Sequence, residues 1–174
     1  MKVVVISGPE STGKSTLTKD LARFYSAKGI SEYARDYVEH LKSPYTIRDV
    51  ETIACRQIAI YRINQRKNNK DDVVFFDTFL VITKVWFQEV YKLCPIWLHL
   101  AIKEFKPNLV LLCKPDIKWT FDGVRENPNL REYLFECYSN EFDIYGINYR
   151  FVEGSGSDRL ESAISALNDF GIKK

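Results

Sequence analysis

The sequence of 174 residues is poor in the residue types that build disulfide frameworks and metal centres. Its four cysteines are far apart and form no C-x-x-C pair, and its two histidines have no partner at ligand spacing. This pattern predicts buried free thiols in a reducing compartment, without a zinc site. The residues concerned are Cys55, Cys94, Cys113, Cys137, His40 and His99.

An excess of one charge and long apolar runs are lacking as well. The net charge is +2, so no basic face for nucleic acid is expected. No stretch approaches the ~18 apolar residues of a membrane span, which argues against a membrane partner. The apolar run at residues 3–7 is too short for a signal peptide. We therefore expect a cytoplasmic protein.

Short apolar segments alternate with longer segments of helical periodicity. The expected strands are KVVVI (2–6), ISEY (30–33), VVFFD (73–77), LVLLC (109–113) and YRFVE (149–153). The expected helices cover 14–28, 47–66, two segments within 79–105, 129–145 and 157–170. This alternation predicts an α/β fold with an open five-stranded parallel sheet between two helical layers. The absence of repeats and linkers predicts a single domain over residues 1–174.

Residues 8–16, GPESTGKST, match the phosphate-loop pattern G-x-x-x-x-G-K-[ST] between an expected strand and an expected helix. Glycines let successive backbone N–H groups face phosphate oxygens, and the helix N-terminus adds partial positive charge. Lysine reaches the β- and γ-phosphates, and the serine hydroxyl can bind Mg²⁺. The predicted nucleotide-binding residues are Gly8, Glu10, Ser11, Thr12, Gly13, Lys14, Ser15 and Thr16.

Asp77 ends the apolar run VVFFD. Ligands of open α/β sheets bind outside the carboxyl ends of the strands, where Lys14 is also expected. Asp77 could therefore help to hold Mg²⁺ or accept a proton from an attacking hydroxyl. The structural alternative is that Asp77 caps the following helix.

Two later segments could also reach the nucleotide. The basic, turn-rich stretch 114–132 carries Arg125 and Arg131, which could close over the phosphates as a lid or form ordinary surface ion pairs. The segment GSGSDR (154–159) ends with Arg159 and could lie beside the base. In that segment we expect Ser157 to cap the last helix.

Taken together, GPESTGKST, EYARDY (32–37), Asp77-Thr78 and PDIKWTFDGVR (115–125) resemble the ribosylnicotinamide kinase domain of NadR proteins, within the wider group of small-molecule P-loop kinases and AAA-like ATPases. The resemblance covers nearly the whole chain. It implies a P-loop NTPase three-layer sandwich with strand order 2-3-1-4-5. It also implies transfer of the ATP γ-phosphate to the 5′-hydroxyl of nicotinamide riboside, with ATP and Mg²⁺ as cofactors.

The same resemblance implies roles for individual residues. Lys14, Asp77, Arg125 and Arg131 would be catalytic, and Ser15 and Asp77 would hold the metal. The acceptor, a small nucleoside-like molecule, would be bound by Glu32, Arg35, Asp77 and Asp122. No adenylyltransferase-like region precedes the first strand, so we expect the kinase step alone.

One departure leaves the acceptor open. Related proteins often read Asp-Thr-Asp after the third strand, whereas this chain has Phe79 at the third position. A cationic nicotinamide ring would gain from a carboxylate or an aromatic face. Phe79, Trp86 and Trp119 could supply that face or belong to the core. The alternatives are a kinase for another nucleoside or sugar and a regulatory P-loop ATPase.

Overall fold

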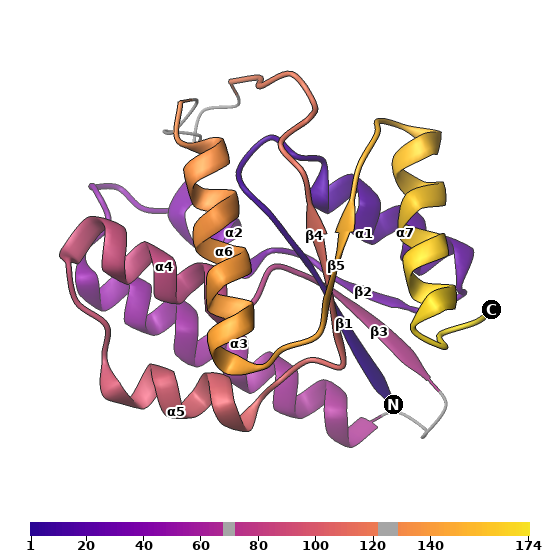
Figure 1. Ribbon diagram of the computed structural model, residues 1–174. Helices are drawn as coiled ribbons and strands as arrows, with labels where there is room; N and C mark the ends of the chain where they lie inside the picture. The colour runs from indigo at the N-terminus through magenta and orange to yellow at the C-terminus, as the bar shows by residue number, and fades with distance from the viewer. Residues whose placement is uncertain (68–71, 122–128) are drawn as a thin grey trace.

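A five-stranded parallel sheet forms the centre of the molecule, with strand order β2-β3-β1-β4-β5 (Figure 1). The computed structural model describes residues 1–67, 72–121 and 129–174. The predicted α/β class, the parallel sheet and its strand order are confirmed. The strands are β1 Lys2–Ser7, β2 Lys28–Ile30, β3 Val73–Asp77, β4 Leu109–Cys113 and β5 Tyr149–Val152.

Helices cover both faces of the sheet, because alternate residues of its strands are apolar on both sides. Val3 and Val5 of β1 belong to a core with α3, α4, α5 and α6, whereas Val4 and Ile6 belong to a second core with α1 and α7. These layers lie on opposite sides of the sheet in Figure 1. The helices are α1 Lys14–Phe24, α2 Tyr33–Glu39, α3 Ile47–Lys67, α4 Leu80–Tyr91, α5 Ile96–Glu104, α6 Arg131–Tyr145 and α7 Ser157–Asp169.

The second strand was predicted wrongly at 30–33. It is the short edge strand β2, which pairs with β3 through Lys28 opposite Val74 and Ile30 opposite Phe76. The next residues turn away from the sheet, and α2 begins at Tyr33. Helix α1 accordingly ends at Phe24, four residues before the predicted end at 28. This turn places Glu32 and the start of α2 at the carboxyl edge of the sheet.

Two smaller predictions were also wrong. Ser157 is the first residue of α7 and does not cap it; Gly156, with φ 55°, occupies the capping position. The four cysteines are free, but Cys55 is exposed, and of the four Cys113 alone is buried. In the described part of the chain, no helix is both long and apolar enough to cross a membrane.

Candidate functional site

The phosphate loop connects β1 directly to α1, and close backbone packing fixes its shape. Gly8 has φ +142°, and a Cβ atom there would lie 2.7 Å from the carbonyl oxygen of Cys113. Gly13 has φ +73° and precedes α1, where no side chain within the described residues caps the helix. The first N–H groups of α1 are therefore available to bind an anion at this end.

Internal hydrogen bonds hold the loop in shape without a nucleotide. The Lys14 ammonium donates to the Pro9 carbonyl oxygen at 2.7 Å, and the hydroxyl of the fully buried Thr12 donates to the same oxygen at 2.8 Å. Lys14 can bind a ligand by exchanging the Pro9 carbonyl oxygen for a phosphate oxygen as its acceptor. Thr16, on the first turn of α1, is exposed, whereas Ser15 is half-buried.

Asp77 reaches the phosphate loop because β3 lies next to β1, with Asp77 opposite Ile6. The Ser15 hydroxyl donates a hydrogen bond to the Asp77 carboxylate, which is only 4% exposed. Its Oδ1 atom is buried and has no hydrogen-bond partner among the described residues. Asp77 does not cap α4, because Phe79 holds that position and no described side chain caps the helix.

Burial raises the pKa of the Asp77 carboxyl above its ordinary value, although the Ser15 hydroxyl, Lys14 and Arg35 act in the opposite direction. The adjacent Thr78 has φ +64°, an unusual conformation for a β-branched residue. Its N–H donates to the Ile6 carbonyl oxygen at 3.0 Å, which anchors the turn to β1. Such strain is typical of functional sites.

Glu32 lies beside Asp77 because the chain turns sharply after β2. Burial raises its pKa above the ordinary value, and the nearby Asp77 adds to the rise, while Lys14, Arg35 and a hydrogen bond from the Thr78 hydroxyl lower it. Two carboxyls, one lysine and one arginine thus converge at one edge of the sheet. The predicted site residues Glu32, Arg35, Asp77 and Lys14 therefore lie close together.

A single cleft of about 670 Å³ extends from the phosphate loop along α2, α4 and α6. One wall of the cleft is aromatic: the Tyr45 ring meets the Trp86 ring edge-on at 4.8 Å, and the buried Tyr138 adds a phenol from α6. Tyr45, Tyr138 and Glu89 were missed in the sequence, because they lie on separate segments that only tertiary packing brings together. The charged lining residues are Glu10, Lys14, Glu32, Arg35, Glu89 and Lys92.

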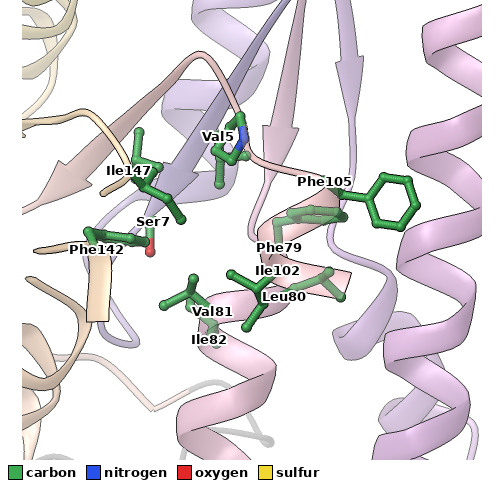
Figure 2. Close-up of a pocket in the computed structure, with 12 residues that line it drawn as sticks. Val5, Ser7, Phe79, Leu80, Val81, Ile82, Ile102, Phe105, Phe142 and Ile147 are labelled. Atoms are coloured by element: carbon green, nitrogen blue, oxygen red, sulfur yellow. The ribbon is translucent and has the colours of Figure 1, made fainter. Parts of the chain in front are cut away.

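Phe79 belongs to the core rather than to this cleft. Its ring stacks on Tyr61 with centroids 5.0 Å apart, and the residue is 6% exposed. Figure 2 shows Phe79 among the apolar side chains around a separate cavity of about 20 Å³. Of the three aromatic candidates for an acceptor face, Trp86 lines the cleft, whereas the indole N–H of Trp119 donates to the Glu10 carboxylate at 3.1 Å.

The segment after β4 is fastened to the phosphate loop. Arg131, the buried first residue of α6, donates to the Ile117 carbonyl oxygen at 2.8 Å and to the Ser11 carbonyl oxygen at 3.3 Å. The Thr120 N–H also donates to the Ser11 hydroxyl, at 3.0 Å. The predicted site residues Asp122 and Arg125 lie outside the described residues, so the lid stays a prediction.

Arg159 lies behind the phosphate loop. Its Cδ atom is 3.8 Å from the position that a Cβ at Gly13 would take. The guanidinium donates to the Gly154 carbonyl oxygen at 2.8 Å and to the Asp116 carboxylate, and the residue is 3% exposed. This network ties the segments after β4 and β5 together beneath the loop. Direct contact of Arg159 with a nucleotide stays a prediction.

Comparisons with known proteins show the family of this chain. A family model described as an AAA domain matches residues 3–159. The trifunctional NAD biosynthesis/regulator protein NadR of Salmonella typhimurium is 31% identical over 129 residues, which are 72% of this chain and 31% of that protein. The chain thus matches about a third of the length of this curated relative.

Solved structures with a similar fold include a NadR protein and a thymidylate kinase. The crystal structure of NadR protein in complex with NR aligns with a TM-score of 0.79 and 26% identity, over 99% of this chain and 52% of that chain. Thymidylate kinase from Ehrlichia chaffeensis aligns with a TM-score of 0.63 over 97% of both chains; at 9% identity it shows a shared fold alone. The predicted resemblance to NadR proteins is confirmed.

Proposed function

Because the chain belongs to the AAA domain family of P-loop proteins, we propose that it is an ATP-dependent small-molecule kinase. It transfers the γ-phosphate of ATP to the 5′-hydroxyl of nicotinamide riboside and releases nicotinamide mononucleotide. The observation that carries this proposal is the single cleft, which joins the phosphate loop to an aromatic wall. Such a cleft can hold a nucleotide and a second small molecule end to end. The NadR relative bound to NR supports the choice of acceptor.

The triphosphate binds at the N-terminus of α1. Backbone N–H groups of the loop and the helix face the phosphate oxygens, and Lys14 leaves the Pro9 carbonyl to contact the β- and γ-phosphates. Phosphoryl transfer spreads negative charge over the transferred group, so positive groups held nearby lower the barrier. In this site Lys14 and Arg35 supply that charge, and the loop amides add to it.

Ser15 and Asp77 fit a magnesium ion. Among the described residues, no group of three or more His, Cys, Asp or Glu side chains is placed to hold a metal. Mg²⁺ is usually bound by one or two carboxylates together with substrate phosphates, and does not need a complete protein cage. The unpartnered Oδ1 of Asp77 beside the Ser15 hydroxyl matches that need. When bound, the ion would neutralise charge on the phosphates.

Glu32 is then free to handle the proton of the acceptor hydroxyl. It lines the cleft, whereas Asp77 faces Ser15 beneath it. A carboxylate with a raised pKa is the better proton acceptor at neutral pH. Glu32 orients the 5′-hydroxyl and takes its proton as the oxygen attacks the γ-phosphate, while the leaving ADP oxygen departs in line.

The proposal is tested by ADP release from ATP and Mg²⁺, with and without nicotinamide riboside and beside a panel of nucleosides and sugars. Nicotinamide riboside should stimulate release strongly, and mass spectrometry should find the mononucleotide. Lys14→Ala and Asp77→Asn should each lower turnover by roughly 10²–10³-fold. Lys103→Ala, which removes an exposed lysine on α5, serves as the control.

Each other outcome has a definite meaning. Stimulation by a different nucleoside or sugar would keep the kinase chemistry and change the acceptor. Slow ADP release that no acceptor alters would overturn the proposal in favour of a regulatory ATPase. Full turnover in Asp77→Asn would remove Asp77 from the mechanism.

A further inference from the structure

Glu89, on α4, places a carboxylate on the lining of the cleft beside Trp86. Trp86 and Glu89 are three residues apart on α4, so they lie on the same face of that helix. Both line the cleft. The Trp86 indole is braced by Tyr45, with ring centroids 4.8 Å apart and planes at 78°. An aromatic surface and an acidic group are therefore neighbours on one wall.

The Glu89 carboxylate is held in place without being neutralised. The Tyr133 hydroxyl of α6 donates to Glu89 Oε1 at 2.9 Å, and the Glu89 side chain is 33% exposed. Among the described residues, Glu89 forms an ion pair with Lys92, whose Nζ is 3.9 Å from Oε2 and whose side chain is 76% exposed. An exposed pair of this kind is weak and is screened by salt. Glu89 thus keeps an available negative charge at a fixed position.

Other carboxylates along the cleft add to the negative field around its aromatic wall. The phenol of Tyr138 is buried in the α6 wall, and burial raises its pKa above the ordinary value. The charges of Glu32, Glu10 and Glu89 raise that pKa further, so all three carboxylates act on the same buried group. Of the positive groups that line the cleft, Lys14 donates to the Pro9 carbonyl oxygen, Arg35 donates from Nε to Glu39 at 2.8 Å, and Lys92 is the exposed partner of Glu89.

We propose that Glu89 is a specificity residue that selects acceptors whose ring carries a positive charge. The inference rests on the proposed kinase function and deepens it: the acceptor class is an N-ribosylated pyridinium, with its ring on Trp86 and its charge facing Glu89. A neutral ring of the same shape keeps the aromatic contact and loses the attraction to the carboxylate. Both attractions act on a cation, because an aromatic face and a carboxylate are each negative.

This assignment also answers the question raised by Phe79. A carboxylate directly after Asp77-Thr78 is missing from this chain, and Phe79 fills the core instead. Glu89 supplies a carboxylate from α4, at the aromatic wall of the cleft. The negative charge that attracts a cationic acceptor is therefore present, but at Glu89, about three helical turns after Phe79 along the chain.

The test compares nicotinamide riboside with its 1,4-dihydro form, which has the same ring substituents without the positive charge. The affinity of each for the full-length protein is measured by calorimetry at neutral pH without ATP, so that binding is read independently of turnover. We expect the wild type to favour the cation. In Glu89→Gln, whose amide oxygen can still accept from Tyr133, the preference should fall about tenfold, which equals ~1.4 kcal/mol.

Glu161→Gln, which removes an exposed carboxylate on α7, is the matched control and should keep the preference. An unchanged preference in Glu89→Gln, or equal binding of both compounds by the wild type, would overturn the assignment of Glu89. If the wild type phosphorylates nicotinamide riboside in the same study, the proposed function survives that result. Binding of neither compound would overturn both the Glu89 assignment and the proposed acceptor, and the nucleoside panel would then show whether a kinase remains.

Discussion

Asp77→Asn is expected to make the nucleotide-free protein more stable while it removes turnover. The ionised Asp77 carboxylate is 4% exposed and has one oxygen without a partner among the described residues. An asparagine of nearly the same shape carries no charge that has to be desolvated. Since the amide also lacks a full set of partners, only part of this cost is recovered, and we expect a gain of about 1–2 kcal/mol. For a chain of this size, that corresponds to about 2–8 °C in Tm.

The gain should depend on pH in a defined direction. Burial raises the pKa of Asp77 in the folded protein, whereas the unfolded chain ionises with an ordinary pKa. Between these two values the folded state holds the proton and the unfolded state does not, so wild-type stability falls as pH rises. The advantage of Asp77→Asn is therefore absent below the ordinary pKa of aspartate. It grows as pH rises and is constant above the folded pKa.

The assay is thermal unfolding of wild type and Asp77→Asn across this pH range, without nucleotide or metal. Asp169→Asn, which alters an exposed carboxylate at the end of α7, controls for net charge. Addition of ATP and Mg²⁺ should stabilise the wild type more than the variant, because ligand binding to the folded state adds to stability. Equal or lower stability of Asp77→Asn at neutral pH would refute the desolvation argument.

Two further predictions concern buried packing. Lys84 forms a buried ion pair with Glu141, their side chains being 4% and 11% exposed. Lys84→Met should therefore lower the free energy of unfolding, measured in urea, by about 3–5 kcal/mol, and the double change with Glu141→Leu should recover most of that loss. A loss below about 1 kcal/mol in the single variant would contradict the role of burial. Gly8→Ala would place a Cβ 2.7 Å from the Cys113 carbonyl oxygen at φ +142°, so nucleotide affinity measured by calorimetry should fall at least tenfold, and unchanged affinity would show that the loop can yield.

The sequence predicted those parts of the fold that are encoded in consecutive residues. The runs VVFFD and LVLLC match β3 and β4 residue for residue, because strands buried on both faces need continuous apolar side chains. Strand β2 was misplaced because Lys28 and Gly29 are exposed and Ile30 is only half-buried, so the strand is ordered by pairing with β3. Such pairing is a long-range effect that leaves no local pattern.

The candidate site divides in the same way. The phosphate loop and Asp77 were found because each lies at the carboxyl end of a strand and carries its chemistry in a short motif. Tyr45, Glu89 and Tyr138 were not found, since each stands alone in its own segment. Glu89 and Tyr138 come together through the packing of α4 against α6, and Tyr45 reaches Trp86 from the loop before α3. An isolated tyrosine or glutamate in a helical segment looks like any surface or core residue until the helices are assembled.

Arg131 connects the phosphate loop to α6. It donates a hydrogen bond to the Ser11 carbonyl oxygen of the phosphate loop, and it begins the helix whose Tyr138 lines the cleft. In the proposed kinase, we expect a nucleotide that moves Ser11 to displace the start of α6, and an acceptor that moves Tyr138 to displace the phosphate loop. Thermodynamic linkage requires the nucleotide to change the affinity for the acceptor by the same factor as the acceptor changes the affinity for the nucleotide. The order in which the two substrates arrive would then alter the path of binding and leave the total binding energy unchanged.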